Sequence, residues 1–299
     1  MQKTHHAKKS LGQNFLKSTT VIKKIVGTGE ISKEDIVLEI GPGKGALTEK
    51  LLESAGCVIA VEKDKNLFIL LQERFKKEIT EKKLILVEDD ILEFDINKSK
   101  ERESVLERTL GRRDGAGQRK FSAENFRGES ENTFSFFLDY KIIANIPYNI
   151  TGAILKKFLT EKNQPSMMVL MVQHEVAKRI MARDGKESIL SISIKAYGEP
   201  KLITKVPSRY FSPEPKVDSA VIAIKNISRK MFEENNVDEN KFWKIIHAGF
   251  AHKRKILISN LKKTLKFDEK TKKICEKMLG NKRAEELTLS DWIFLAKNT

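Results

Sequence analysis

The chain has 299 residues, of which 56 are Lys or Arg and 41 are Asp or Glu, giving a formal net charge of +15. That charge is typical of a protein that lies on phosphates, and the length allows a sizeable core in two domains. No apolar run reaches membrane-spanning length, residues 1–10 are basic without an apolar stretch after them, and Cys57 and Cys275 form no zinc spacing. We therefore expect a non-secreted, cytoplasmic protein that uses neither a membrane nor a metal.

In chain order, an amphipathic helix around Val21–Val26 is followed by a strand, a glycine loop and a second helix. Ile36–Ile40 is a short apolar run rich in β-branched residues, Gly41-Pro42-Gly43-Lys44-Gly45 follows at once, and Ala46–Ser54 has helical periodicity. Glycines let the backbone approach a ligand closely, and the helix start behind them offers unpaired N–H groups. The pattern predicts the nucleoside-binding half of a doubly wound sheet.

Acidic residues accompany the ends of three predicted strands. Glu39 lies two residues before the first glycine, Glu62 ends the strand Cys57–Val61, and Asp90 follows the strand Leu84–Val87. Glu62 is placed to accept hydrogen bonds from ribose hydroxyls, Asp90 suits an adenine amino group, and Glu39 suits a cationic methionine moiety. These acids favour S-adenosylmethionine as the ligand.

A nicotinamide cofactor remains the alternative at this point. The segment Gly41–Ala46 also satisfies the dinucleotide pattern G-x-G-x-x-A, which is typical of dehydrogenases. Titration with S-adenosylmethionine and with NADH separates the two interpretations.

Residues 97–138 fit neither a strand nor a helix. The charged stretch Asn97–Asn132 contains four glycines and has almost no apolar periodicity. Compact domains rarely tolerate such long structureless loops, so the composition predicts a disordered insertion between Asp90 and the next strand.

The strand Tyr140–Ala144 ends in Asn145-Ile146-Pro147-Tyr148. The Asn145 side-chain oxygen and the Ile146 carbonyl are able to accept the two N–H bonds of an adenine amino group, and Pro147 stiffens the turn. Tyr148 is placed to stack on a base taken out of its helix. These four residues also fit an ordinary Asn-X-Pro turn at a strand end.

Taken together and in this order, the motifs resemble the ribosomal RNA adenine N6-dimethyltransferases, and most closely the small-subunit branch. The resemblance covers most of the chain. The matching segments are Leu11–Leu16, Glu39–Gly43, Glu62, Asp90, Asn145–Tyr148, Gln173–Arg179, Phe211–Ser219 and Gly249–Lys255.

The resemblance implies roles for particular residues. The implied cofactor-binding residues are Asn14, Leu16, Glu39, Gly41, Gly43, Glu62, Lys63, Asp90, Ile91 and Asn145. The implied catalytic residues are Asn145, Ile146, Pro147, Tyr148 and Phe211, with Phe211 as the wall of the adenine pocket opposite Tyr148. The basic residues Lys253, Arg254 and Lys255 are similar to a helix start in the family's C-terminal domain and are the implied RNA contacts.

The expected fold is α/β: a doubly wound, Rossmann-like S-adenosylmethionine-dependent methyltransferase domain in residues 1–226, and a small helical RNA-binding domain in residues 227–299. The resemblance implies an enzyme that dimethylates two adjacent adenines in the RNA of the small ribosomal subunit during assembly, and we expect it to be a monomer. Ile146 stands where the small-subunit branch commonly has Leu, so a macrolide-resistance enzyme acting on large-subunit RNA remains an alternative. A non-catalytic RNA-binding factor with the same fold is another.

Overall fold

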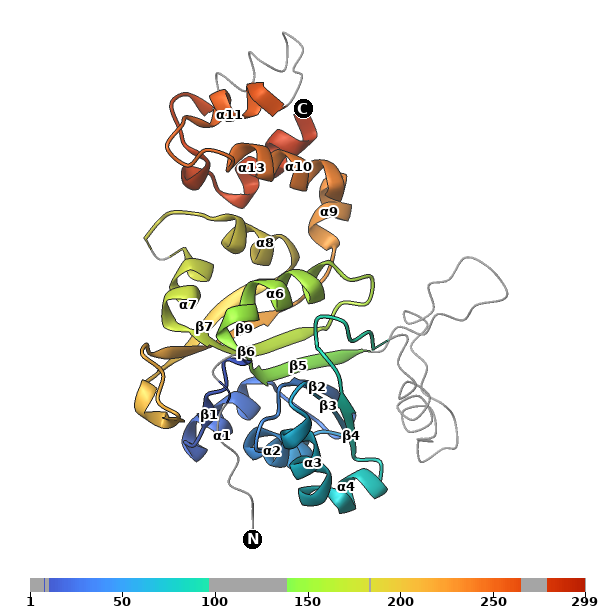
Figure 1. Ribbon diagram of the computed structural model, residues 1–299. Helices are drawn as coiled ribbons and strands as arrows, with labels where there is room; N and C mark the ends of the chain where they lie inside the picture. Colours follow the sequence, from blue (N-terminus) through green and yellow to red (C-terminus); the bar gives the residue numbers. More distant parts are fainter. Residues whose placement is uncertain (1–7, 9–10, 97–138, 183, 265–278, 299) are drawn as a thin grey trace, which may run out of the picture. The chain divides into compact units, whose positions relative to one another are not determined.

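A computed structural model describes residues 8, 11–96, 139–182, 184–264 and 279–298 (Figure 1). The described chain forms two compact units, residues 1–173 with 203–223 and residues 174–202 with 224–299. The second unit therefore includes residues 174–202, which the sequence analysis placed in the first domain. The division into two functional domains at residue 226 stays a prediction. The predicted insertion 97–138 lies outside the described residues. None of the described helices is long and apolar enough to cross a membrane.

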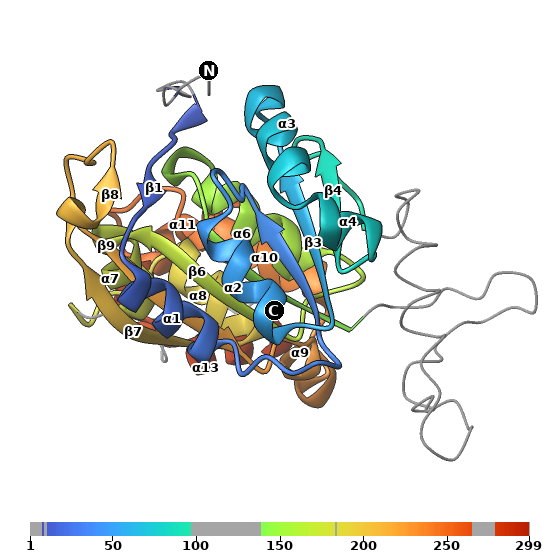
Figure 2. The ribbon, with the colours of Figure 1, turned by 90° about the horizontal axis from the view of Figure 1, so that it is seen from below.

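A seven-stranded sheet organises the molecule (Figures 1 and 2). Its strands are β2 (Ile36–Ile40), β3 (Cys57–Glu62), β4 (Leu84–Glu88), β5 (Tyr140–Asn145), β6 (Met167–Gln173), β7 (Glu199–Val206) and β9 (Ser219–Lys225), in the order β4-β3-β2-β5-β6-β9-β7. The pairs β4–β3, β3–β2, β2–β5 and β5–β6 are parallel. The order reverses between β2 and β5, and this switch point is where an open α/β sheet binds its ligand. The predicted doubly wound fold is confirmed.

The helices of the first unit cover both faces of its strands. They are α1 (Thr19–Thr28), α2 (Ala46–Ser54), α3 (Lys65–Arg74), α4 (Lys76–Thr80), the short 3-10 helix η3 (Tyr148–Ile150) and α6 (Thr151–Thr160). Figure 1 shows α1 and α2 on one side of β5 and β6, and α6 on the other. Because parallel strands are buried on both faces, β2 and β3 consist of buried residues throughout.

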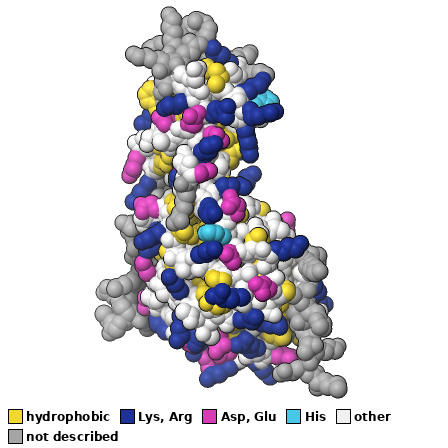
Figure 3. Space-filling view, turned by 90° about the vertical axis from the view of Figure 1, so that its left-hand side faces the viewer, with side chains coloured by type: hydrophobic (Ala, Val, Ile, Leu, Met, Phe, Trp, Pro, Cys, Tyr) yellow, Lys and Arg dark blue, Asp and Glu magenta, His cyan; other side chains and the backbone are white. Residues whose placement is uncertain are grey.

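The second unit is helical apart from parts of β7 and β9. Its helices are α7 (His174–Met181), α8 (Ile189–Tyr197), α9 (Lys230–Asn235), α10 (Glu239–Gly249), α11 (Leu257–Thr264), the 3-10 helix η5 (Ala284–Glu286) and α13 (Leu289–Asn298). Trp292 and Phe242 are fully buried in it. α9 follows directly after the predicted domain boundary at residue 226. On the surface drawn in Figure 3, Lys and Arg side chains are spread widely rather than gathered in one patch.

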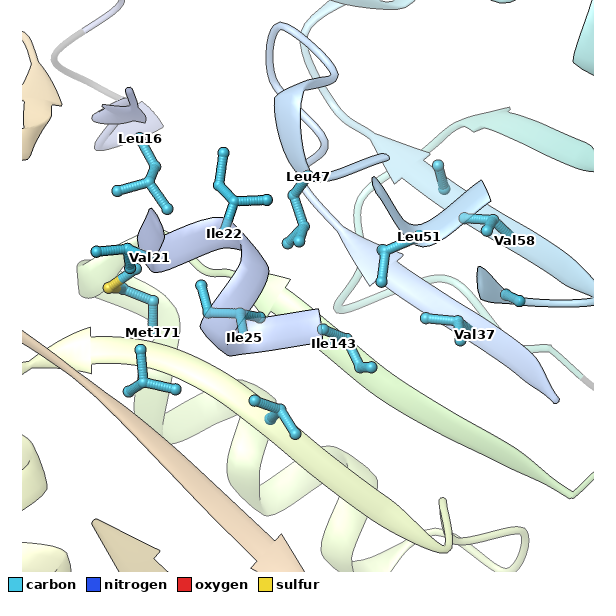
Figure 4. Close-up of a cluster of buried hydrophobic side chains, with 14 of the residues drawn as sticks. Leu16, Val21, Ile22, Ile25, Val37, Leu47, Leu51, Val58, Ile143 and Met171 are labelled. Carbon is cyan, nitrogen blue, oxygen red and sulfur yellow. The ribbon is translucent and has the colours of Figure 1, made fainter. Parts of the chain in front are cut away.

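Apolar side chains of α1 and α2 form a core with the strands of the sheet. Figure 4 shows Ile22 and Ile25 of α1 beside Leu47 of α2, with Val37 of β2 and Ile143 of β5 below them. The apolar residues of α1 recur at helical spacing, so one face of this helix is buried against the sheet. This packing holds the strand ends and the start of α2 rigidly together.

A second, two-stranded sheet joins the N-terminal segment of the first unit to a segment close to the last residues of that unit. β1 (Phe15–Leu16) pairs antiparallel with β8 (Phe211–Ser212), which follows the 3-10 helix η4 (Ser208–Tyr210), and Leu16 lies opposite Phe211. The Lys17 amide also donates to the Tyr210 carbonyl at 2.8 Å. The segment before α1 is therefore fixed to a loop that lies almost 200 residues later in the chain.

Candidate active site

The glycine loop after β2 and the acid at the end of β3 are hydrogen bonded to each other. Gly43 adopts φ of +61°, which favours glycine, and its backbone amide donates to Glu62 Oε2 at 3.1 Å. A Cβ on Gly43 would lie only 3.0 Å from the Phe15 ring. The loop thus keeps its shape because Gly43 has no side chain and because Glu62 accepts a hydrogen bond from the Gly43 amide.

Glu62 is 5% exposed and accepts a second amide, that of Asp64, at 2.8 Å through Oε1. Burial raises the pKa of the Glu62 carboxyl, and the amides of Asp64 and Gly43 oppose that rise. Each carboxylate oxygen keeps a further lone pair, so Glu62 retains capacity for two hydroxyl donors.

Glu39, on β2, is 1% exposed, and its Oε2 has no hydrogen-bond partner among the described residues. Burial raises the pKa of this carboxyl to about 8; Thr48 opposes the rise and the neighbouring Glu62 adds to it. A buried acceptor without a partner is costly unless a ligand supplies one. Glu39 is therefore suited to a group that donates a hydrogen bond, and a cation beside it would favour the ionised form of its carboxyl.

Asp90 follows β4 and is held in place by two donors. Lys63 Nζ lies 2.6 Å from Asp90 Oδ2, and the Leu92 amide donates to Oδ1 at 3.0 Å. The hydrogen bond from Lys63 and the Leu92 amide hold the pKa of Asp90 below its ordinary value. Asp90 is thus an ionised acceptor, in contrast to Glu39.

Asp64 holds the N-terminal segment and was not among the site residues predicted from the sequence. Its buried carboxylate accepts Lys8 Nζ and Gln13 Nε2, each at 2.9 Å, and the Asn66 amide at 3.0 Å. The Asp64 amide is the one that donates to Glu62. Asp64 caps the start of α3, and nothing local in the sequence indicates that Lys8 and Gln13 return to it.

The Asn145 turn is also fixed by the N-terminal segment. Asn145 Nδ2 donates to the Asn14 carbonyl at 3.0 Å, which orients the amide so that Oδ1 remains an acceptor. No hydrogen bond to this Oδ1 occurs among the described residues. Tyr148, the first residue of η3, shares a hydrogen bond of 2.5 Å with Ser219. The turn therefore presents an acceptor and an aromatic ring from one rigid segment.

One cavity of about 530 Å³ brings these elements together within the first unit. Its lining includes all ten residues predicted to bind the cofactor, and also Ile146, Pro147 and Tyr148 of the predicted catalytic turn. Residues that the sequence did not single out, such as Gln13, Asn149 and Ser212, line it as well. The volume is in the range of small-molecule sites.

Phe211 is the predicted residue that the structure does not bring to the cavity. It is 1% exposed and packs in the core cluster with Leu16, whose partner it is across β1 and β8. Pairing with β1 directs this apolar side chain into the interior, so in this conformation Phe211 does not form the second wall of a base pocket. The neighbouring Ser212 lines the cavity instead.

The cavity suits S-adenosylmethionine on the chemistry of its own residues. The unpartnered Glu39 oxygen matches a cationic methionine moiety, Glu62 matches two ribose hydroxyls, and Asp90 matches an amino group of adenine. No group of three or more His, Cys, Asp or Glu side chains suited to a metal occurs among the described residues. Parallel strands, a glycine loop and these acids define the class: a Rossmann-like nucleoside-binding enzyme of the methyltransferase kind.

Comparisons with known proteins place the chain within that class. The family model described as ribosomal RNA adenine dimethylase matches residues 4–298. A protein of Dehalococcoides mccartyi strain CBDB1, named ribosomal RNA small subunit methyltransferase A, is 37% identical over 97% of this chain and 87% of its own length. The chain belongs to the ribosomal RNA adenine dimethylase family and is an S-adenosylmethionine-dependent methyltransferase. The predicted resemblance is confirmed, and the oxidoreductase alternative is wrong.

Two solved structures share the fold. The dimethyladenosine transferase of Plasmodium falciparum has a TM-score of 0.70 at 23% identity, with 94% of this chain and 95% of that one covered. A 23S rRNA methyltransferase, ErmE, has a TM-score of 0.66 at 21% identity, with 95% and 99% covered. At these identities the likeness concerns the fold alone.

Proposed function

We propose that the chain transfers methyl groups from S-adenosylmethionine to N6 of adenines in small-subunit ribosomal RNA, and that it dimethylates two adjacent adenines during ribosome assembly. The observation that carries the proposal is that Glu39, Glu62, Asp90 and the Asn145 turn line the same cavity. The name of the Dehalococcoides relative supports the small subunit. We further propose that the protein acts as a monomer in the cytoplasm.

Each of the three acids binds a different part of the cofactor. Glu62 accepts the ribose hydroxyls, Asp90 accepts from the adenine amino group beside Ile91, and Glu39 faces the cationic methionine moiety. Gly41 and Gly43 allow the backbone to approach, while Asn14 and Leu16 close the cavity from the N-terminal segment. When bound, S-adenosylmethionine supplies an electrophilic methyl group.

The Asn145 turn prepares the target nitrogen. The lone pair of an adenine amino group is delocalised into the ring, which makes the nitrogen a poor nucleophile. Acceptance of its two N–H bonds by Asn145 Oδ1 and the Ile146 carbonyl directs that lone pair toward the methyl donor. The bond from Asn145 Nδ2 to Asn14 fixes the acceptor beforehand, so catalysis depends on positioning and on carbonyl dipoles. The methylated nitrogen is acidic and releases its proton to solvent.

Tyr148 stacks on the flipped adenine, a contact worth about 1–3 kcal/mol for a base on an aromatic side chain. Phe211 takes part only if its side chain leaves the core, since it is buried beside Leu16. Tyr148 is therefore the principal aromatic contact in this proposal.

The loop between α10 and α11 is the proposed RNA contact. Lys253, Arg254 and Lys255 are exposed in this loop, not at a helix start as the sequence suggested. The buried Asn260 donates to the carbonyls of Gly249 at 2.7 Å and His252 at 3.1 Å, and these two hydrogen bonds hold the loop in place. Three adjacent cations in a fixed loop suit a phosphate backbone. We propose residues 227–299 as the RNA-binding domain and 1–226 as the catalytic one.

The second candidate is a large-subunit enzyme, which Ile146 favours. The deciding experiment offers the protein and S-adenosylmethionine three substrates: undermethylated small subunits, naked small-subunit RNA and naked large-subunit RNA. Mass spectrometry of the nucleosides should find N6,N6-dimethyladenosine in the small-subunit material. Methylation of large-subunit RNA alone would favour the second candidate. Absence of transfer despite cofactor binding would leave a non-catalytic RNA-binding factor.

A further inference from the structure

The ring of Tyr148 is anchored from outside the cavity. Its hydroxyl lies 2.5 Å from Ser219 Oγ, at the first residue of β9, 71 residues later in the chain. Tyr148 lines the cavity, whereas Ser219 is fully buried and does not. The hydrogen bond therefore joins a residue that lines the cavity to a buried residue that does not.

Both ends of the Tyr148 side chain are consequently fixed. At the backbone, the Tyr148 carbonyl accepts Thr151 Oγ1 at 3.1 Å, and the Ile150 amide donates to the Pro147 carbonyl at 3.3 Å. At the far end, the hydroxyl is held by Ser219. With two rotatable side-chain bonds between these anchors, the plane of the ring is set before a base arrives, and preorganisation of this kind lowers the entropic cost of stacking.

Ser219 is itself held firmly. The preceding Asp218 accepts the Ser208 amide at 3.0 Å and pairs with Lys205 Nζ at 2.8 Å. From Ser219 onward, six of the seven residues of β9 are buried. The hydroxyl of Ser219 is thus a fixed point of the sheet.

We propose that Ser219 is a positioning residue for adenine capture, which holds the Tyr148 ring in the plane on which the flipped base stacks. The inference rests on the proposed function. It also gives the segment Phe211–Ser219 a different role from the one expected: its first residue is buried in the core, and its last residue orients the aromatic wall.

A double-mutant cycle tests the proposal. Ser219→Ala and Tyr148→Phe each remove one hydroxyl of the pair and keep the ring. Each should raise KM for undermethylated small subunits by about three- to tenfold, the scale of one hydrogen bond, with a smaller effect on kcat. The double variant should be no worse than either single variant, because both remove the same interaction. S-adenosylmethionine affinity in calorimetry should stay unchanged.

Tyr140→Phe is the matched control, because it removes another buried tyrosine hydroxyl of the same unit, bonded to the Asn163 carbonyl at 3.1 Å and outside the cavity. Its KM should equal that of the wild type. If Ser219→Ala fails to fold, Tyr148→Phe against Tyr140→Phe still decides the question. An unchanged KM in Tyr148→Phe, or additive effects in the cycle, would overturn the role of Ser219. A wild-type protein that methylates no small subunits would overturn the proposed function instead.

Discussion

Glu62 on β3 and Glu88 on β4 lie directly opposite each other in the parallel register, yet only Glu62 lines the cavity. Glu88, on the edge strand β4, is exposed, while Glu62 is covered by the glycine loop and accepts a hydrogen bond from the Gly43 amide. The same residue type in the same register therefore has two environments.

This pair provides the first prediction. Glu62→Ala should weaken S-adenosylmethionine binding about tenfold or more, because the ribose hydroxyls and the Gly43 amide lose their acceptor. Glu88→Ala removes the same side chain one strand away and should bind the cofactor normally. Calorimetric titration of both variants measures the difference. Equal affinities would mean that Glu62 shapes the loop without contacting the cofactor.

The second prediction concerns the Asn145 turn. Asn145→Ala should lower the rate of methyl transfer by about 100-fold or more, the scale seen when one polarising group leaves a preorganised site. Binding of ribosomal RNA should change much less. Asn66→Ala, which truncates an exposed Asn of the same unit, is the control and should keep the wild-type rate. Single-turnover kinetics compare the three proteins; dimethyladenosine formed at the normal rate by the Asn145 variant would refute the proposed role.

The third prediction is a pH dependence of stability. Burial raises the pKa of Glu39 from 4.5 to about 8, so the folded state holds the proton more tightly than the unfolded state does. The resulting stabilisation is fully present below about pH 4.5 and is lost as the pH rises toward 8. Each unit of pKa difference corresponds to about 1.4 kcal/mol, so the loss amounts to a few kcal/mol.

Urea unfolding at pH 6 and pH 8.5 measures this effect. Glu39→Gln cannot ionise and should lose less stability than the wild type between the two pH values. The comparison uses the difference between the two proteins because burial also raises the pKa of Glu62. Parallel pH profiles for the wild type and the variant would show that Glu39 is ionised in the folded protein at both pH values.

The fourth prediction concerns the exposed loop before α11. Reversal of charge at Lys253, Arg254 and Lys255 should weaken binding to the small subunit and flatten the dependence of affinity on salt, because fewer counterions are released. Cofactor affinity should not change. A control with Lys23, Lys24 and Lys76 reversed has the same net charge, with exposed positions in the first unit. If both triple variants show the same salt slope, net charge rather than this loop attracts the RNA.

Much of the cavity was predictable because its parts are local in sequence. The strand Ile36–Ile40 and the helix Ala46–Ser54 have the predicted bounds, since apolar β-branched runs and helical periodicity are short-range signals. Glu62 and Asn145 were found because each stands at the end of such a strand.

The remaining parts depend on contacts between distant segments. Strands of two residues carry no periodicity, so the pairing of Phe211 with Leu16 and the burial of Phe211 could not be predicted. Gln13 and Asp64 are 51 residues apart, and their hydrogen bond follows only from the folded position of both segments. The partnership of Tyr148 with Ser219 was hidden for the same reason.

The pairing of β1 with β8 also has a consequence for how the protein is made. Leu16 is synthesised early, but its strand partner Phe211 emerges only after more than two thirds of the chain has been translated. Contacts of such long sequence separation form late, since the intervening chain must first be ordered. The N-terminal wall of the cavity is thus completed only after residues 211–212 have been translated, so a nascent chain binds the cofactor fully only when nearly all of the first unit has left the ribosome.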